Sequence, residues 1–229
     1  APNNMVLAFT GNFDWDQLSL IAEESCNAWQ AQHVERKIEA YLGKKALERI
    51  RKENLTREHI CLMSPAVSAQ DPRRFAASVL ASVIGDDVGS RYFWELVDKA
   101  MAETAAMQFG AMDGTGVFCS YISCSSANIH KVYNTIESLF ERLKKDGVKS
   151  EEITAAKNKI LSALVIKNEL PMGRLVDLGF NWTYLQQYRT IEEDVAAVKA
   201  VTMDDIVFLL RDFDPGNFTQ LSMGSSPMQ

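Results

Sequence analysis

The chain has 229 residues, of which 47% are hydrophobic and 24% are charged, as is usual for a globular domain. Its 24 Lys and Arg are interspersed with 30 Asp and Glu for a net charge of -6, which argues against nucleic-acid binding. No apolar run approaches the ~18 residues of a membrane span, and residues 1–10 lack the pattern of a signal peptide.

Residues 1–29 predict a strand followed by a helix. The apolar run 5–10 ends at Gly11 and is typical of a buried strand. Asp14 then opens an amphipathic helix. The apolar face of this helix consists of Leu18, Ile21, Ala22, Cys26 and Trp29.

Residues 30–57 are highly charged and lose the apolar faces seen before them, so they predict a linker. Within this linker we expect a helix near residues 34–42 and a strand near residues 46–52.

A larger domain is predicted over residues 58–229. It begins with an apolar strand at residues 59–64, which Pro65 is expected to stop. Asp71 and Pro72 then predict a helix start, with Asp as the N-cap and Pro in the first turn. That helix carries an apolar stripe of Phe75, Ala76, Val79, Leu80, Val83 and Ile84.

The middle of this domain predicts a short helix, a hairpin and a long helix. The short helix is expected over residues 90–100. Two strands at residues 104–109 and 116–124 flank Asp113 and Gly114, a hairpin signal. The most regular helical stripe follows, and it consists of Ile129, Val132, Tyr133, Ile136, Leu139, Phe140 and Leu143.

The last part of the chain is predicted to be mostly helical. Ser150 is expected to cap a helix that runs to about residue 169, and Pro171 starts another that continues through Tyr188. Two shorter helices begin with capping-box pairs, which are Thr190 with Glu193 and Thr202 with Asp205. Residues 218–223 alternate apolar and polar side chains, which suits a closing strand.

This order of elements predicts an α+β domain, because hairpins and consecutive helices are segregated along the chain. We expect an antiparallel sheet with helices packed on one face.

The four cysteines, Cys26, Cys61, Cys119 and Cys124, include no Cys-x-x-Cys pair and form no disulfide framework. Cys119 and Cys124 are five residues apart in one predicted strand, so they point to opposite faces and should not share a metal. We therefore expect four reduced, mostly buried thiols.

Three stretches carry a resemblance when taken in order. Residues 4–14 read Asn-Met-Val-Leu-Ala-Phe-Thr-Gly-Asn-Phe-Asp, and residues 59–65 read His-Ile-Cys-Leu-Met-Ser-Pro, followed by Asp71-Pro72. Residues 84–96 begin Ile-Gly and end Gly-Ser-Arg-Tyr-Phe-Trp-Glu-Leu, which is similar to a Leu-Gly…Ser-Ser-Arg-Leu-Phe…Glu-Leu block. Together they resemble the C-terminal half of a pitrilysin/insulinase-type zinc metallopeptidase or its non-catalytic homologue.

The resemblance implies that each half is an antiparallel sheet backed by helices, and that two halves enclose a chamber that takes in peptides. Members include oligopeptide-degrading proteases, mitochondrial processing peptidase and largely structural core subunits of respiratory complexes. The fold alone therefore does not settle activity.

The family's zinc motif is an inverted His-x-x-Glu-His with a distant Glu. This chain has only His33, His59 and His130, too far apart in sequence to form it. Glu58-His59 imitates the end of the motif, but Leu55 stands where the first His would be, so we interpret Glu58-His59 as a surface pair. No catalytic residue, metal ligand or cofactor is expected in this chain; zinc is expected in the N-terminal half of an active parent protein.

Other catalytic signals have simpler explanations. The sequence contains no Gly-x-Ser-x-Gly elbow and no Gly-x-x-x-x-Gly-Lys loop. The acid pairs at 86–87, 192–193 and 204–205 fall in loops and helix starts, where the helix dipole favours them. The aromatic run of residues 92–94 is interpreted as core packing.

In many active relatives the C-terminal half contributes an Arg and a Tyr, seven residues apart, that hold the substrate backbone. The resemblance places these substrate-binding positions at Val97 and Thr104, so both side chains are missing. Arg91 belongs to the preceding Ser-Arg element, which we interpret as structural.

The leading hypothesis is a non-catalytic C-terminal half that supplies chamber wall and peptide contacts to an N-terminal catalytic half or a sister subunit. The alternative is a scaffold or interaction protein of the same fold that has lost protease activity. A third is an unrelated α+β binding domain. A His-x-x-Glu-His motif upstream in the parent protein would favour the first.

Overall fold

The computed structural model describes residues 2–35 and 43–225. Five strands form a single sheet in the order β1-β5-β2-β4-β3. Their bounds are Leu47–Arg51 (β1), Glu58–Ala66 (β2), Thr104–Met112 (β3), Thr115–Cys124 (β4) and Thr219–Gly224 (β5). Neighbouring strands are antiparallel, except that β1 runs parallel to β5. The predicted α+β fold, with a mainly antiparallel sheet, is confirmed.

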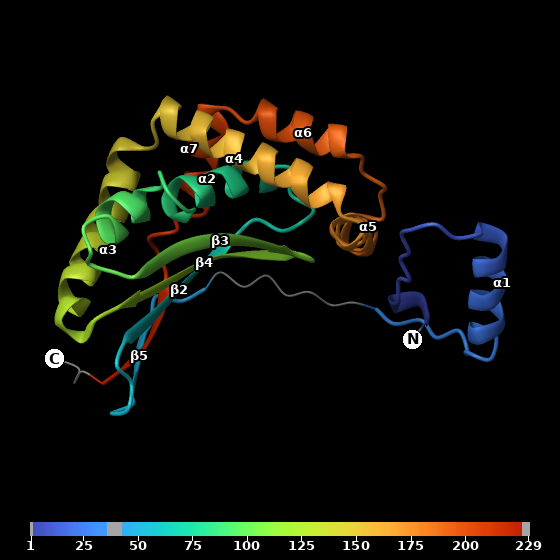
Figure 1. Cartoon of the computed structure of the whole chain (residues 1–229), viewed down its shortest axis with the longest axis horizontal. Helices are drawn as coiled ribbons and strands as arrows, with labels where there is room; N and C mark the ends of the chain where they lie inside the picture. The colour runs from blue at the N-terminus through green and yellow to red at the C-terminus, as the bar shows by residue number, and fades with distance from the viewer. Residues whose placement is uncertain (1, 36–42, 226–229) are drawn as a thin grey trace.

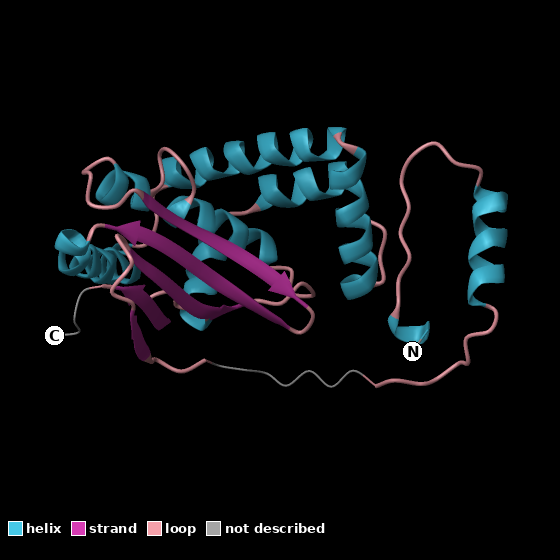
Figure 2. Cartoon of the chain, turned by 60° about the horizontal axis from the view of Figure 1, so that its bottom comes forward, coloured by secondary structure: helices cyan, strands magenta, loops and turns pink. Residues whose placement is uncertain are grey.

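The helices form a layer on one face of this sheet (Figure 1). They are α2 (Arg74–Gly85), α3 (Ile129–Asp146), α4 (Ser150–Glu169), α5 (Pro171–Leu185), α6 (Ile191–Ala200) and α7 (Met203–Asp212). Three short elements are η1 (Pro2–Asn4), the π-helical η2 (Phe93–Val97) and η3 (Ser126–Asn128). In the described part of the chain, none of these helices lies on the opposite face of the sheet (Figures 1 and 2).

The N-terminal part lies at the α5 end of this body, where a Cβ built on Gly179 of α5 would lie 3.8 Å from that of Ala8. Helix α1 (Trp15–Cys26) lies beyond α5 in both views, and none of its residues is buried (Figures 1 and 2). Its predicted N-cap is confirmed, because the Asp14 carboxylate accepts a hydrogen bond from the backbone N–H of Gln17 at 2.9 Å. The helix ends at Cys26, so the prediction that Trp29 belongs to its apolar face is wrong.

The core lies between the sheet and the helices. Ile60 on β2 and Phe118 and Ile122 on β4 are completely buried there. The predicted stripes of α2 and α3 point at them and are buried except for Phe75 and Tyr133, which are half-buried. These stripes are therefore confirmed, since their 3.6-residue spacing places every member over the sheet.

The last residue of α2 is a glycine, Gly85, because the helix approaches strand β3 closely there. A side chain at Gly85 would place its Cβ 2.4 Å from the backbone nitrogen of Met107 on β3, a distance that real contacts do not reach. The Ile-Gly pair that contributes to the family resemblance thus marks where α2 packs directly on the sheet.

Two predicted boundaries near the start of the sheet domain are wrong. Pro65 does not stop β2, which continues to Ala66. β5 reaches only Met63, so Pro65 lies beyond its end and its missing N–H costs no bond to that strand. Helix α2 begins at Arg74, not at Pro72, because the Asp71 carboxylate accepts from the backbone N–H of Arg73 at 2.8 Å and holds a turn.

The predicted strand at residues 5–10 is also wrong, since this stretch has no regular structure and mostly exposed side chains. A strand needs a partner for its backbone hydrogen bonds, and no described strand lies beside it. The predicted helix near residues 34–42 falls largely outside the described residues, whereas the strand near residues 46–52 is confirmed as β1.

The later helices follow the prediction closely. Both capping boxes are present, at Thr190 and Thr202. Helix α4 begins at Ser150, although the cap is Lys149. Helix α5 ends at Leu185, earlier than predicted, because Gln186 takes a left-handed conformation with φ of 53°. None of the described helices is long and apolar enough to cross a membrane.

Candidate functional site

The face of the sheet opposite the helices is the first candidate site. Strand pairing brings together side chains that alternate with the core residues, including Met63 on β2, Tyr121 on β4 and Leu221 on β5. These three are 49%, 44% and 40% exposed, whereas their neighbours in sequence are buried against the helices. We call this surface the uncovered face.

Two polar side chains of the uncovered face, His59 and Tyr121, contact each other. The Nδ1 atom of His59 and the Oη atom of Tyr121 are 2.7 Å apart, and which of them donates depends on the histidine tautomer. Their rings stack, with centroids 6.0 Å apart and planes inclined by 24°. The two side chains thus hold each other in place on the sheet.

The interpretation of Glu58-His59 as a surface pair is wrong for Glu58, which is completely buried. Its carboxylate forms an ion pair with Arg49 of β1 at 2.5 Å and accepts a hydrogen bond from the Ser126 hydroxyl at 3.0 Å. Gly224 leaves room for this carboxylate, because a Cβ there would lie 1.8 Å from Oε2. Glu58 therefore ties β1 and the η3 turn to β2.

The structure does not bring the three histidines together. His59 lies on β2, His130 is exposed at the start of α3, and His33 is exposed in the N-terminal part. Across residues 2–35 and 43–225, no group of three or more His, Cys, Asp and Glu side chains is arranged to hold a metal ion.

The thiols are less buried than expected. Only Cys124 is buried, whereas Cys26, Cys61 and Cys119 are partly exposed, so the prediction of mostly buried thiols is wrong. Cys119 and Cys124 do lie on opposite faces of β4, as their odd spacing predicted.

Val97 and Thr104 do come together. Both line a pocket of about 330 Å³ between the end of α2, the η2 helix and the edge strand β3. Phe93 and Asp87 line it as well. Whether these positions contact a substrate stays a prediction. The two residues, seven apart in sequence, line one pocket because Val97 ends η2 and Thr104 begins β3.

The aromatic run at residues 92–94 divides between core and surface. Tyr92 is fully buried, its hydroxyl lies 2.9 Å from that of Ser120, and burial raises its pKa. Trp94 is 52% exposed, so the core-packing interpretation is wrong for it. Leu96 follows Trp94 by two positions, and residues two apart in a helix point to nearly opposite sides. Leu96 is therefore buried in the core, whereas Trp94 faces solvent.

Arg91 is a structural residue, as interpreted from the sequence. Its guanidinium makes two hydrogen bonds of 2.8 Å to the carboxylate of Glu152 and a third to the carbonyl of Gly147. The pKa of Glu152 is lowered: burial opposes ionisation, but the hydrogen bonds from Arg91 and from the backbone of Lys149 outweigh it. These contacts fasten the η2 region to the start of α4.

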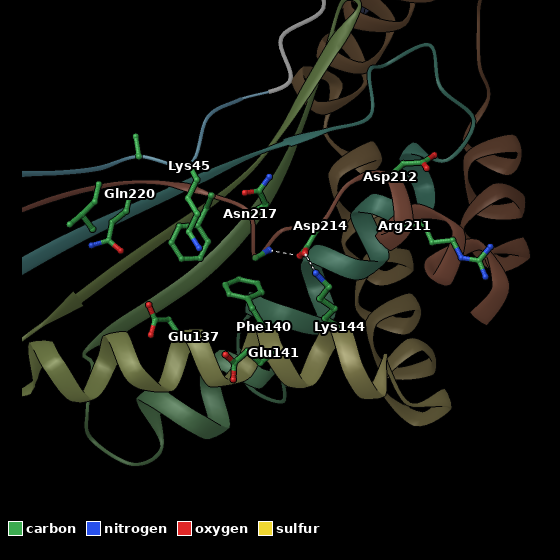
Figure 3. A pocket seen from close by; sticks show the side chains of 14 residues that line it. Lys45, Glu137, Phe140, Glu141, Lys144, Arg211, Asp212, Asp214, Asn217 and Gln220 are labelled. Carbon is green, nitrogen blue, oxygen red and sulfur yellow. Dashed lines mark hydrogen bonds and ion pairs between the residues drawn. The ribbon is translucent and has the colours of Figure 1, made fainter.

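A larger groove of about 870 Å³ lies where β1 and β5 meet α3 and the end of α7 (Figure 3). Acidic Glu137 and Glu141 face it from α3, and Lys45 reaches into it from the other side (Figure 3). Lys144 and Asp214 pair across 3.6 Å. The sequence gives no signal for this groove, because β1 and β5, which form one wall, are far apart in sequence. Among the described residues, its lining includes no His, Cys or Ser.

The chain was compared with models of known protein families. Residues 1–160 match the profile described as the peptidase M16 inactive domain. An uncharacterized zinc protease of Bacillus subtilis is 24% identical over 162 residues, which cover 70% of this chain and 40% of that protein. An uncharacterized zinc protease of Mycobacterium bovis is 22% identical over 214 residues, which cover 90% of this chain and 48% of that protein.

Solved structures agree on the fold. A peptidase M16 inactive domain from Pseudomonas fluorescens has a TM-score of 0.83 at 16% identity over 96% of this chain and 53% of its own. A chain of complex III2 from Candida albicans has a TM-score of 0.79 at 16% identity over 94% of this chain and 54% of its own. The chain thus spans about half, or less, of the length of these relatives.

Proposed function

The chain belongs to the family of the peptidase M16 inactive domain, and from this premise we propose that it is the non-catalytic half of a zinc metallopeptidase. It supplies a chamber wall and peptide contacts to a catalytic half, which is either the N-terminal part of the same protein or a sister subunit. The expected resemblance to the C-terminal half of a pitrilysin/insulinase-type enzyme is confirmed by the family match and by the zinc proteases among the relatives.

The uncovered face is the observation that carries this proposal. An antiparallel sheet often buries one face and leaves the other to solvent, but here apolar Met63 and Leu221 remain 49% and 40% exposed on the open side. A surface that mixes such side chains with the His59–Tyr121 pair suits contact with a peptide backbone and its apolar side chains.

The same role is supported by a repeated pattern at the two ends of the chain. Residues 2–11 read Pro-x-Asn, then six residues, then Gly, and residues 215–224 have the same pattern. The second copy contains β5, which lies between two other strands of the sheet. We infer that residues 5–10 serve as the equivalent strand in the sheet of the preceding half.

This inference supports the predicted division of the chain. Residues 1–29 are then a strand and helix that continue the preceding half, residues 30–57 are a linker, and residues 58–229 are the C-terminal domain. The exposed apolar side chains of Met5, Leu7 and Phe9 have their partners in that half. β1 lies within the linker range and pairs with β5, so the linker also contributes a strand to the C-terminal sheet.

Zinc in this proposal belongs to the catalytic half. Elemental analysis after dialysis is expected to find no tightly held zinc in this chain by itself and one zinc per molecule in the parent protein or its complex. One zinc held by this chain alone would contradict the assignment of the metal to the other half.

The missing Arg and Tyr define what the catalytic partner must supply. With Val97 and Thr104 in their place, this half cannot clamp a substrate backbone beside the zinc, and losing such positioning costs on the order of 100-fold in rate. We expect efficient peptide cleavage only when a partner chain contributes the pair. Full activity of the purified parent alone, unchanged by V97R/T104Y, would contradict this expectation.

A matched pair of substitutions tests the chamber wall. Leu221→Asp places a charge on the uncovered face, and Val207→Asp places one at a similarly exposed residue of α7, on the helix side; these residues are 40% and 37% exposed. We expect Leu221→Asp to raise the KM for peptides in the assembled protease, while Val207→Asp leaves it unchanged. Equal effects of the two would contradict the role of the uncovered face.

The alternative is a scaffold of the same fold, favoured by the fold likeness to a chain of complex III2 and by the missing pair at Val97 and Thr104. In that case the complex containing this chain neither binds zinc nor cleaves peptides in any combination of subunits, which the same metal analysis and assays reveal.

A further inference from the structure

Two cysteines face each other on the uncovered face. The Sγ atoms of Cys61 on β2 and Cys119 on β4 lie 3.9 Å apart, and both residues are partly exposed. Met63 lies directly opposite Cys119 in the strand register, and its position two residues from Cys61 puts it on the same face. We propose that Cys61, Cys119 and Met63 bind one soft metal ion, with Cu(I) as the expected metal.

The separation of the two sulfurs fits a bridging ion. Metal–thiolate bonds are about 2.3 Å long for a d10 ion such as zinc. Two bonds of about that length span 3.9 Å with an angle of about 115° at the metal, near the tetrahedral value. The ion can therefore sit between Cys61 and Cys119 without any movement of the strands.

A disulfide fits this geometry less well. Cys61 pairs directly with Tyr121, so Cys119 is its diagonal neighbour. Diagonal neighbours across antiparallel strands lie about 7–8 Å apart at Cα, whereas disulfides rarely span more than about 7 Å. A metal ion adds the length that a direct S–S bond lacks.

The ligand types select the metal. Thiolate and thioether sulfurs are soft and favour Cu(I). Zinc prefers four nitrogen, sulfur or oxygen ligands, and in the described parts of the chain no third His, Cys, Asp or Glu completes a group around the two thiols. Met63 is 49% exposed, and its flexible thioether can turn toward the thiols.

The proton balance makes binding dependent on pH. The two thiols bind as thiolates, so one Cu(I) displaces two protons. Because cysteine ligands must lose their protons to bind, the affinity for the metal should fall as the pH is lowered.

The experiment is an anaerobic titration of the reduced chain with Cu(I) buffered by bathocuproine disulfonate. We expect one Cu(I) per chain. Cys61→Ser and Cys119→Ser should each weaken binding by about 100-fold or more, because each removes a thiolate ligand. Met63→Leu should weaken it by about tenfold, because it removes a thioether ligand.

Cys26 is a partly exposed cysteine outside the cluster, so Cys26→Ser is the control and should bind as the unsubstituted chain does. Unchanged binding in both Cys61→Ser and Cys119→Ser would overturn the proposal.

Two measurements on the unsubstituted chain keep the test decisive if a variant fails to fold. X-ray absorption of the Cu(I) complex should show sulfur neighbours, and Cu(I) should protect Cys61 and Cys119, but not Cys26, from alkylation mapped by mass spectrometry. Coordination by nitrogen or oxygen alone, or equal alkylation of all three cysteines, would refute the site. The proposal uses only side chains of this chain and stands whether or not the chamber-wall function does.

Discussion

The two faces of the sheet differ in what their residues do for the protein. On the covered face, Ile60, Phe118 and Ile122 are completely buried under the helices. On the uncovered face, Met63 and Tyr121 of the same strands are exposed to nearly half their surface. The covered face therefore determines whether the domain folds, whereas substitutions on the uncovered face should act mainly on binding.

The largest expected effect comes from the charge buried on the covered face. Glu58→Ala removes the carboxylate that pairs with Arg49, whose side chain is 8% exposed. Breaking one side of a buried ion pair costs about 3–5 kcal/mol. Urea unfolding should show this loss, and the double substitution Arg49→Met with Glu58→Leu should recover most of it. A loss below about 1 kcal/mol, as for a surface pair, would show that the covered face tolerates charge.

Adjacent residues of β4 give the most direct comparison. Ile122→Ala empties a fully buried position and should cost about 2–5 kcal/mol. Tyr121→Ala, one residue earlier on the uncovered face, should cost less than about 1 kcal/mol, as surface substitutions usually do. Thermal unfolding of the two variants checks the difference, and equal losses would mean that the uncovered face is part of the core.

A smaller effect is expected at the turn that leads into the helix layer. The hydrogen bond from the Arg73 side chain lowers the pKa of Asp71 despite partial burial. The folded state therefore favours ionised Asp71. Its contribution is present above about pH 4, near the unfolded pKa, and is lost as the pH falls through the lower folded pKa.

Asp71→Asn should accordingly destabilise the protein at pH 7 by less than about 1 kcal/mol, because the pair is partly exposed. The difference from the unsubstituted protein should shrink as the pH falls toward 3. Urea unfolding at the two pH values measures it, with the exposed Asp98→Asn as control. If the difference in the free energy of unfolding grew as the pH fell, ionised Asp71 would not be the form that stabilises the fold.

The smallest effect on stability is expected in the N-terminal part. Helix α1 has no buried residue, so deletion of residues 1–29 should change the free energy of unfolding of the remainder by less than about 0.5 kcal/mol. The same deletion should abolish association with the catalytic half, if residues 5–10 complete its sheet. A large loss of stability, measured by calorimetry, would place this segment in the domain described here.

Local signals in the sequence were sufficient for most elements of the sheet domain. The stripes of α2 and α3, the Asp113-Gly114 hairpin and the capping boxes at Thr190 and Thr202 were all predicted. Each depends on side chains within a few residues of one another, so the sequence contains the whole cause. The family resemblance was equally local, because it rests on short blocks in a fixed order.

The features that were predicted wrongly depend on partners distant in sequence. Residues 5–10 have the composition of a strand, but a strand forms only beside another strand. Glu58 looks like a surface acid until the pairing of β1, β2 and β5 brings Arg49 to it across the sheet.

The sequence by itself thus determined the helices, the hairpin, the family and the lack of a His-x-x-Glu-His motif, because spacing along one chain is enough for each. Only the tertiary structure decided which face of the sheet stays open, that Val97 and Thr104 share a pocket, and that Cys61 and Cys119 meet at 3.9 Å. Strand register sets the neighbours of Cys61 and Cys119 and is fixed only when the strands pair. The open face and the pocket depend on how the helices pack on the sheet, which involves residues far apart in sequence.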